Sequence, residues 1–403
     1  MFTIIFEIAI FILILSFLVI IHELGHFFAA RWAKIKVEEF GLGYPPRAVT
    51  LFTWAGTIFS LNWIPFGGFV RMDGEDGPIN DAELEQEEKP SSKVNKKSVK
   101  TPTKTQLNSE EGPFYTKSAF KRMVVILAGV IVNFAFGIFA FSVVYSIKGI
   151  PELIDSARIA TIMPGSPAEV AGLPTGVEII SIITSSEEQF TIQSNADVIS
   201  AVADQGGNVV TIVTTGACSD QYGCQESAQM FDVYVRTQDE IPNPENEGAL
   251  GIRFQEFVMA QYPWYQMPFR GTLVGVEQTY MLIVLTLAEL QKMFVEVSTG
   301  GPLPADISGP VGIVHQANEY QIFRQGPLMI LNFAGVISAS LAIMNLLPIP
   351  ALDGGRAVFI MIEPLIGKKR VRKFEGYANY GGFIFLIFLI VIITARDIWR
   401  IFS

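Results

Sequence analysis

Residues 1–26 read MFTIIFEIAIFILILSFLVIIHELGH, an apolar run that ends in two histidines and a glutamate. The first 21 of these residues carry one charge, Glu7, and are long enough to cross the hydrocarbon core of a bilayer as a helix. A cleaved signal peptide would begin with basic residues and end at a small-residue site, and this run does neither. We therefore expect a retained transmembrane helix with polar chemistry at its end.

The composition of the whole chain is that of a membrane protein. Half of its 403 residues are hydrophobic, only 17% are charged, and the mean hydropathy is +0.38, which leaves too little charge to cover a soluble surface. Three further apolar stretches follow, at about 123–145, 327–347 and 381–394. We expect a polytopic α-helical protein with about four spans in a lipid bilayer. The net charge of −10 provides no basic face, so nucleic acid is not an expected partner.

The segments between the spans complete the domain organisation. Residues 47–63 indicate two strands around Ala55-Gly56. Residues 76–112 are almost free of large apolar side chains, which is typical of a flexible insertion. The expected order is a first span at 1–35, a β-hairpin region at 36–75, the insertion at 76–112, a second span at 113–148, a polar folded domain at 149–270, a surface helix and loop at 271–325, a third span at 326–356, and a basic loop with the fourth span at 357–403.

Basic residues predict the orientation of the spans. Residues 31–122 hold 14 Lys and Arg, whereas residues 149–269 hold three, and another cluster, KKRVRK, occupies 368–373. Because Lys and Arg are enriched in cytoplasmic loops, the first connection and the last loop are expected inside and the polar domain outside. Residues 272–296 are interrupted by four charges, so we expect an amphipathic helix on the outer leaflet rather than a crossing.

His22-Glu23-Leu24-Gly25-His26 is an H-E-x-x-H motif. On a helix, positions i and i+4 lie on one face, so both imidazoles can bind one metal ion. The glutamate between them then stands beside the ion as a base for the attacking water. The alternative is a pair of interfacial histidines with a helix-end carboxylate, but ionisable residues in a membrane span are costly and usually functional. The motif therefore predicts a catalytic zinc site.

A catalytic zinc needs three protein ligands, and the candidates for the third are His315 and Asp353. The basic-residue count places His315 outside, away from the cytoplasmic end of the first span. If residues 272–296 do not cross the membrane, the third span runs inward and delivers Asp353 to the depth of the two histidines. If they did cross, Asp353 would lie on the other face, roughly 30 Å away. Asp353 is therefore the expected ligand.

HELGH at 22–26 and NLLPIPALDGG at 345–355 together resemble the site-2 protease family of intramembrane zinc metalloproteases, and in arrangement its bacterial sigma-E-regulating branch. The match covers most of the chain and is specific. Further matching motifs are FGLGYP at 40–45, IPFGGFVRM at 64–72, Ala128-Gly129 with Asn133, and SGPVG at 308–312. Two departures are Val130, where a proline is common, and Arg356, where a histidine is common.

The resemblance implies a function and a set of site residues. It implies zinc ligation by His22, His26 and Asp353, with Glu23 as general base and with Asn345, Pro348 and Pro350 receiving an unwound substrate helix. The implied reaction is hydrolysis of a peptide bond within the transmembrane segment of single-span proteins, such as an anti-sigma factor already trimmed on its outer side. The implied location is the bacterial inner membrane, with the active site near the cytoplasmic side.

The same resemblance also implies roles for the hairpin and for residues 156–257. The hairpin would be a membrane-associated sheet whose edge pairs with the substrate backbone; a plain surface hairpin is the alternative. Residues 156–257 resemble a single PDZ domain, where related proteins carry up to two. Such a domain would either capture a peptide end or exclude substrates with bulky outer domains, and the sequence does not separate these roles.

Cys218 and Cys224 are the only cysteines. In an outer-facing loop they are expected to form a disulfide rather than remain free thiols. Two rival functions exist for the whole chain. A catalytically silent scaffold that binds partners through the PDZ-like domain is disfavoured by the intact His22, Glu23, His26 and Asp353. A transporter is disfavoured by the lack of paired inverted repeats.

Overall fold

The computed structural model describes residues 2–75, 112–154, 156–215, 218–219, 223–224, 228–241, 247–299 and 308–402. Nearly all of the predicted flexible insertion at 76–112 lies outside these ranges. The chain forms two compact units, one made of residues 1–147 and 264–403 and the other of residues 148–263.

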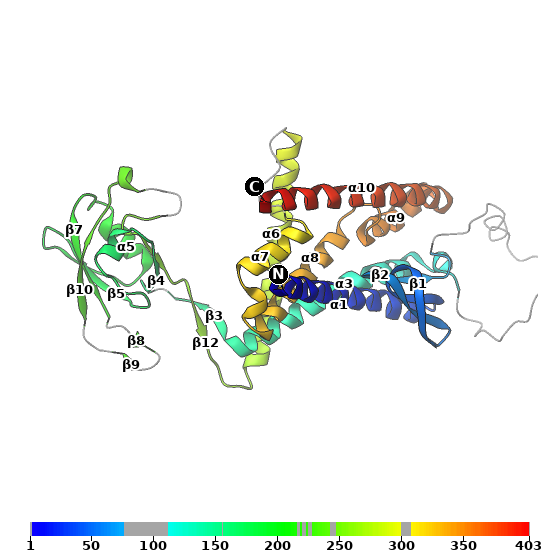
Figure 1. Cartoon of the computed structure of the whole chain (residues 1–403), viewed down its shortest axis with the longest axis horizontal. Helices are drawn as coiled ribbons and strands as arrows, with labels where there is room; N and C mark the ends of the chain where they lie inside the picture. Colours follow the sequence, from blue (N-terminus) through cyan, green and yellow to red (C-terminus); the bar gives the residue numbers. More distant parts are fainter. Residues whose placement is uncertain are drawn as a thin grey trace, which may run out of the picture. The chain divides into compact units, whose positions relative to one another are not determined.

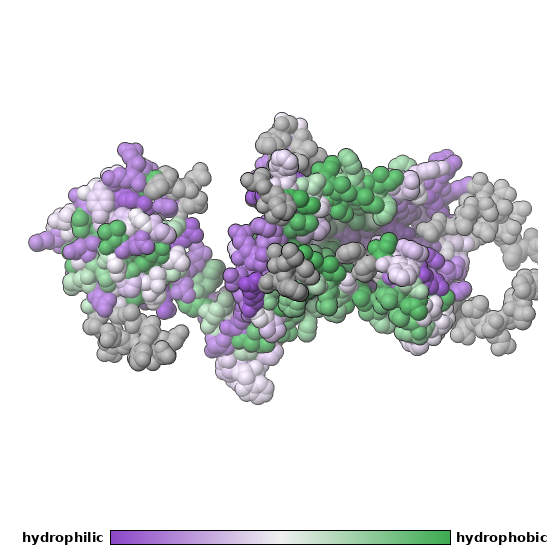
Figure 2. Space-filling model, viewed as in Figure 1, coloured by the Kyte–Doolittle hydropathy of each residue, from purple (hydrophilic) through white to green (hydrophobic). Residues whose placement is uncertain are grey.

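The first unit is helical and carries one β-hairpin (Figure 1). Its helices are α1 (Phe2–Trp32), η1 (Phe114–Thr116), α3 (Ala119–Lys148), α6 (Met267–Ser298), α7 (Pro310–Glu319), η3 (Ile322–Arg324), α8 (Pro327–Leu346), α9 (Asp353–Ile366) and α10 (Lys368–Phe402). The exposed side chains of α10 between Phe383 and Ile392 are apolar, as expected for lipid contact, and Figure 2 shows hydrophobic side chains gathered over this part.

Five described helices are long and apolar enough to cross a membrane, one more than the predicted four. They are α1, α3, α6, α8 and α10. The additional candidate is α6, which contains the segment expected to lie on the membrane surface. Residues 278–288 of α6 are free of charge, and Arg270 and Glu277 are the only charges before them, so an apolar stretch interrupted by few charges reaches spanning length. In Figure 1, α6 runs crosswise to α1, α3 and α10.

Helices α1 and α3 pack with their backbones in close approach. A Cβ added at Gly25 of α1 would lie 2.6 Å from the carbonyl oxygen of Ala128 on α3. Only a residue without a side chain allows this contact, a device typical of helix packing in membranes. On the other side of α3, Ser338 Oγ of α8 donates to the backbone oxygen of Asn133 at 2.9 Å. These contacts fix α3 between α1 and α8.

Glu7, the one charge in the first apolar run, is 3% exposed. Its Oε1 lies 3.3 Å from Nη2 of Arg324, in the turn before α8. A buried carboxylate without a partner would be costly, and this ion pair supplies one. The ion pair between Glu7 and Arg324 therefore links the start of α1 to the segment that precedes α8.

The predicted hairpin at 47–63 is part of a larger one. Strands β1 (Val37–Trp54) and β2 (Thr57–Met72) pair antiparallel around the turn at Ala55-Gly56. Each strand bends, so that Gly41 lies opposite both Ser60 and Phe69. The second half of β2, residues 68–72, therefore forms an edge of the sheet, on the side of α1. Among described pairs, β2 contacts α1 more than any other helix.

The second unit is built from short strands. Their bounds are β3 (Ile150–Leu153), β4 (Ile159–Ile162), β5 (Ile179–Ile183), β6 (Gln189–Thr191), β7 (Val209–Thr214), β8 (Cys218–Ser219), β9 (Gly223–Cys224), β10 (Gln229–Tyr234), β11 (Ile252–Phe254) and β12 (Phe257–Ala260), with helices α4 (Pro167–Val170), α5 (Asn195–Val202) and η2 (Gln238–Glu240). A four-stranded sheet has the order β10-β7-β5-β6, and β4 pairs with β11 and β3 with β12. Helix α5 begins with a capping box of Ser194 and Asp197.

Side chains from this sheet and from α5 form one hydrophobic core. Ile159, Ile182, Ile212 and Val233 have no exposed surface, and Val198 of α5 packs among them. Ile179 of β5 and Val210 of β7 belong to the same core. This core is what allows residues 148–263 to form a unit of their own.

The cysteine pairing stays a prediction, and the backbone register gives it support. Strands β8 and β9 pair antiparallel with Cys218 directly opposite Cys224. Directly opposed positions have Cβ atoms about 4.5–5.5 Å apart, close to what a disulfide needs. We expect mass spectrometry of unreduced protein to show a Cys218–Cys224 linked peptide. Two freely alkylated thiols in the folded, unreduced protein would contradict the bridge.

Candidate metal centre

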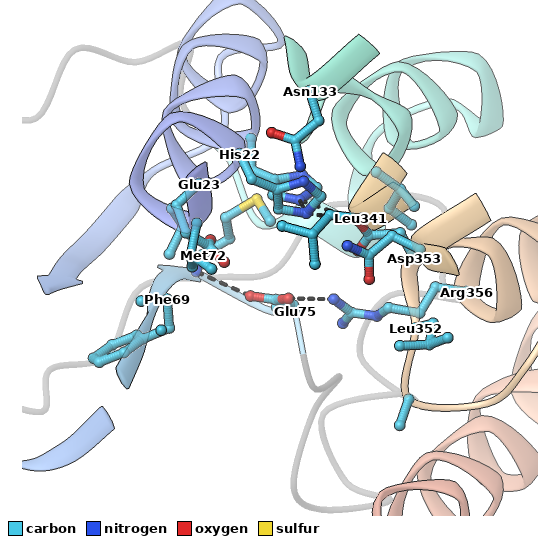
Figure 3. Close-up of a pocket in the computed structure, with 18 of the residues that line it drawn as sticks. His22, Glu23, Phe69, Met72, Glu75, Asn133, Leu341, Leu352, Asp353 and Arg356 are labelled. Carbon is cyan, nitrogen blue, oxygen red and sulfur yellow. Dashed lines mark hydrogen bonds and ion pairs between the residues drawn. The ribbon is translucent and has the colours of Figure 1, made fainter. Parts of the chain in front are cut away.

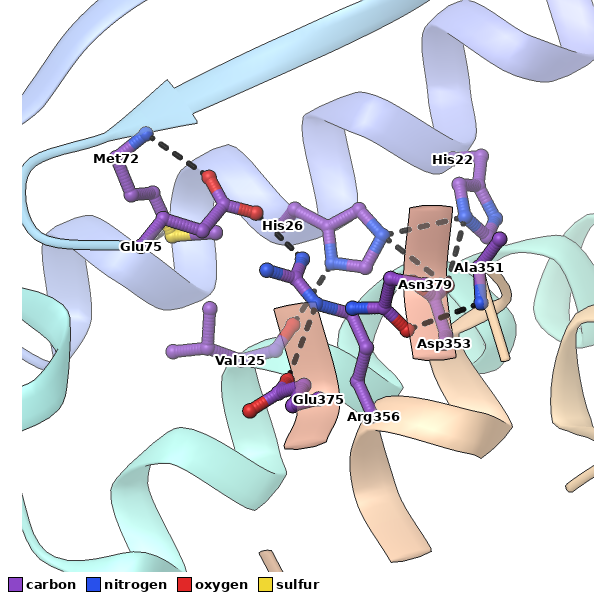
Figure 4. A network of polar contacts seen from close by, with 10 residues as sticks. All are labelled: His22, His26, Met72, Glu75, Val125, Ala351, Asp353, Arg356, Glu375 and Asn379. Atoms are coloured by element: carbon purple, nitrogen blue, oxygen red, sulfur yellow. Dashed lines mark hydrogen bonds and ion pairs between the residues drawn. The ribbon is translucent and has the colours of Figure 1, made fainter. Parts of the chain in front are cut away.

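Three potential metal ligands, His22, His26 and Asp353, lie close together beside α1. His22 and His26 lie one helical turn apart, and their Nε2 atoms are 3.2 Å from each other. Asp353, the first residue of α9, places its Oδ2 at 3.1 Å from His22 Nε2 and 3.3 Å from His26 Nε2 (Figure 4). Both histidines are less than a tenth exposed. The structure thus brings together residues that are more than 320 positions apart in the sequence.

These distances fit a tetrahedral zinc ion. Nitrogen and oxygen ligands lie about 2.0–2.2 Å from zinc, which separates two ligands of a tetrahedron by about 3.4 Å. Two imidazoles and one carboxylate are a donor set that catalytic zinc sites use, with the fourth position open. Among the described residues, this is the group of His, Cys, Asp and Glu side chains close enough to hold an ion. His315 lies in α7 and is not part of the group.

The chain reaches this position through a tight turn after α8. Helix α8 ends at Leu346, and Ala351 adopts a left-handed conformation with φ of 73°. The N–H of Ala351 donates to Asn379 Oδ1 of α10 at 3.1 Å. A Cβ added at Gly354 would lie 2.2 Å from the carbonyl oxygen of Leu346. The turn between α8 and α9 therefore places Asp353, the first residue of α9, beside the two histidines.

His26 is oriented from its other nitrogen. Its Nδ1 lies 2.8 Å from the backbone oxygen of Val125 on α3 (Figure 4). A carbonyl only accepts, so Nδ1 carries the proton and the lone pair of Nε2 faces His22 and Asp353. This is the arrangement that metal-binding histidines show.

Gly129 of α3 leaves the space in which the donor atoms meet. A Cβ added there would lie 2.5 Å from His26 Nε2 and 2.7 Å from His22 Nε2. His26 is also held in this position by its bond to the backbone oxygen of Val125. The residue that the sequence comparison placed in an Ala-Gly motif is therefore required by the shape of the site.

The three donors form part of the wall of a cavity of about 500 Å³ (Figure 3). Glu23 faces the same cavity, as does Asn345 of α8, whereas Pro348 and Pro350 are not among its lining residues. The second half of β2 forms the opposite wall with Gly67, Gly68, Phe69, Val70 and Met72. Asn133 of α3 and Tyr44 of β1 also line it. The cavity has the mixed polar and apolar character of a substrate site.

Comparisons with known proteins show which family the chain belongs to. The family model of peptidase family M50 matches residues 10–389. The chain belongs to that family, the site-2 proteases. It is 28% identical to the zinc metalloprotease RasP of Oceanobacillus iheyensis, over 97% of this chain and 98% of that protein. It is also 28% identical to a putative zinc metalloprotease of Rickettsia conorii, over 98% of each chain, and 27% identical to one of Fusobacterium nucleatum, over 97% and 98%.

The M50 family membership gives the chain its class. It is a multi-pass membrane protein and a zinc metalloprotease, in accordance with the prediction from HELGH and LDGG. Zinc is its cofactor, and its family acts on membrane-embedded substrates.

A polar network that the sequence analysis did not predict lies beside the donors of this M50 protein. Arg356, one turn after Asp353, pairs through Nη1 with Glu75 Oε1 at 2.5 Å, and its Nε lies 3.9 Å from Glu375 Oε1 on α10. Glu75 also accepts from the N–H of Met72 at 3.2 Å. The network ties the end of β2 to α9 and α10. Its members are far apart in the sequence, so no local spacing predicts it.

Replacing Gly129 by alanine tests the shape of the site. The added methyl group collides with both Nε2 atoms, so Gly129→Ala should purify with less than about a tenth of the zinc bound by the unaltered protein, measured by elemental analysis. Gly137→Ala is the matched control on α3, because a Cβ there meets only ordinary contacts of 3.4 Å or more. Full zinc in Gly129→Ala would show that the donors do not meet where this geometry places them.

Proposed function

We propose that this chain hydrolyses a peptide bond within the transmembrane segment of single-span membrane proteins, with zinc held by His22, His26 and Asp353. The observation that carries the proposal is the position of the three donors. They lie within 3.3 Å of one another, and they line a cavity that apolar helices and one sheet edge enclose. Hydrolysis inside a membrane needs such a place, where polar groups and water are sheltered from lipid.

Glu23 is the proposed general base. It follows His22 on α1 and faces the cavity, so its carboxylate stands beside the donors without being one of them. When bound, zinc supplies a Lewis acid that polarises a peptide carbonyl and makes water more acidic. Glu23 takes the proton from the attacking water and returns it to the leaving nitrogen. This division of roles is the one that the H-E-x-x-H spacing predicts.

The edge of β2 is the proposed place where the substrate backbone binds. Gly68 and its neighbours on β2 face the cavity, and a Cβ added at Gly68 would lie 3.4 Å from Cγ of Glu23. A substrate strand added to this edge would therefore run past the base. Asn345, which lines the cavity, would contact the extended segment. Pro348 and Pro350 would act by shaping the turn that carries Asp353.

The proposed topology keeps α6 on the outer surface. Its crosswise direction in Figure 1 supports this orientation, since α1, α3 and α10 run along another axis. The first connection and residues 368–373 are then cytoplasmic, and residues 148–263 are extracytoplasmic in a bacterial inner membrane. We infer that this second unit is a PDZ-like domain that acts on the outer portion of substrates. A membrane protein already trimmed there, such as an anti-sigma factor, is the proposed substrate.

Variants of the site residues test the proposed chemistry. Glu23→Gln keeps the shape of the side chain but cannot take a proton, so it should bind about one zinc per chain and cleave nothing detectable. His22→Ala, His26→Ala and Asp353→Ala each remove a donor and should lose or weaken zinc binding. Membrane proteins trapped by Glu23→Gln and identified by mass spectrometry would name the substrates.

The same variants separate the protease from a silent scaffold. A scaffold would bind its partners equally well in the unaltered protein and in Glu23→Gln, and neither would cut them. Appreciable cleavage by Glu23→Gln would instead reject the assigned base while leaving the protease in place.

The topology is tested by cysteine labelling in intact cells. In a background with Cys218 and Cys224 changed to serine, cysteines at Ser91 and Lys369 should resist an impermeant thiol reagent. A cysteine at Gln205 should react, because the second unit is proposed to face outward. Labelling at position 369 from outside would place the last loop on the wrong side for Asp353 to share a membrane depth with His22.

A further inference from the structure

Asn133 is a buried polar residue for which neither the fold nor the zinc site accounts. Its side chain lies in the middle of α3, and the residue is 1% exposed. Both amide atoms, Oδ1 and Nδ2, lack a hydrogen-bond partner among the described residues. Only its backbone oxygen is used, by Ser338 Oγ at 2.9 Å. A buried amide with neither atom paired is costly, so such a group calls for a ligand that the free protein lacks.

The position of the side chain indicates where that ligand binds. Asn133 lines the same cavity as His22, Glu23 and Asp353, and Figure 3 shows its amide directed toward the imidazole of His22. It follows Gly129 by four residues, a rise of about 6 Å along α3. Since Gly129 lies against both Nε2 atoms, the amide stands just beyond the donors, toward the middle of the membrane. A substrate atom placed between the metal donors and the Asn133 amide would contact both.

We propose that Asn133 is a catalytic residue whose Nδ2–H donates to the oxygen of the peptide carbonyl under attack; this proposal rests on the function proposed above. As the water oxygen bonds to the carbonyl carbon, the π pair of the C=O bond moves onto the carbonyl oxygen, and the water proton goes to Glu23. The oxygen then carries negative charge in a site without bulk water. A donor already fixed at that point stabilises the charge without reorganising.

The surroundings of Asn133 favour this role over the orientation of a ligand. A residue that orients His22 would bond to its Nδ1, but that atom also lacks a partner in the described structure. His26, by contrast, already has its orienting bond to Val125. The side chain of Asn133 is therefore held by packing, and its backbone by Ser338, with the amide left for the substrate.

The test compares Asn133→Ala with two variants of the full chain in liposomes. The substrate is a quenched-fluorescence peptide with one apolar transmembrane segment that the unaltered protein cleaves. Asn133→Ala should bind zinc fully and keep its KM, with kcat lowered about 10²- to 10³-fold. Asn133→Asp, which has the same shape but no donor, should lose as much. Ser338→Ala removes the neighbouring hydrogen bond and keeps the amide, so its kcat should stay within a few-fold of normal.

A second readout does not depend on turnover. An apolar peptide phosphinate has tetrahedral phosphorus oxygens that imitate the attacked carbonyl, so Asn133→Ala should bind it about 10²- to 10³-fold more weakly. Loss of zinc in Asn133→Ala would make the residue a ligand-orienting one and overturn the proposal. Equal losses of kcat in Asn133→Ala and Ser338→Ala would assign the effect to packing and do the same. Normal kcat in Asn133→Ala, with Glu23→Gln inactive, would reject this inference and leave the proposed function standing.

Discussion

The contact between α1 and α3 is the constraint on which the rest of the site depends. Gly25 lets the two backbones approach, and Gly129 leaves room for the imidazoles that α1 turns toward α3. The same contact brings the backbone oxygen of Val125 within hydrogen-bonding distance of His26. A larger residue at either glycine would separate the helices or displace the donors. The position of the two imidazoles therefore follows from helix packing, before any metal is considered.

Several buried charged groups of the first unit are held by a polar partner. Glu7 pairs with Arg324, and Arg122 of α3 pairs with Glu363 of α9. Asp397 of α10 is 5% exposed and accepts from the N–H groups at the start of α7, including Gly309 at 2.8 Å. Each pair joins elements far apart in sequence, and each would be costly to break. Asn133 differs from these groups, because neither atom of its buried amide has a hydrogen-bond partner among the described residues.

The sequence predicted the parts of the site that follow local rules. The spacing of His22 and His26 required only the helical period, and the choice of Asp353 over His315 required only the parity of spans. The turn at Ala55-Gly56 was readable from its residues, but the length of the hairpin was not, because Gly41 pairs on both sides with residues distant in sequence. The network of Glu75 and Arg356 was missed for the same reason. For α6, an apolar stretch interrupted by Glu277 fits both a surface helix and a crossing helix.

The central claim is that two imidazoles and one carboxylate hold the zinc. X-ray absorption at the zinc edge of the purified full-length protein tests it most directly. We expect nitrogen and oxygen ligands only, at about 2.0–2.2 Å, with the outer-shell scattering of two imidazoles. Scattering from a third imidazole would contradict the assignment of Asp353. A sulfur ligand at about 2.3 Å would contradict the whole donor set.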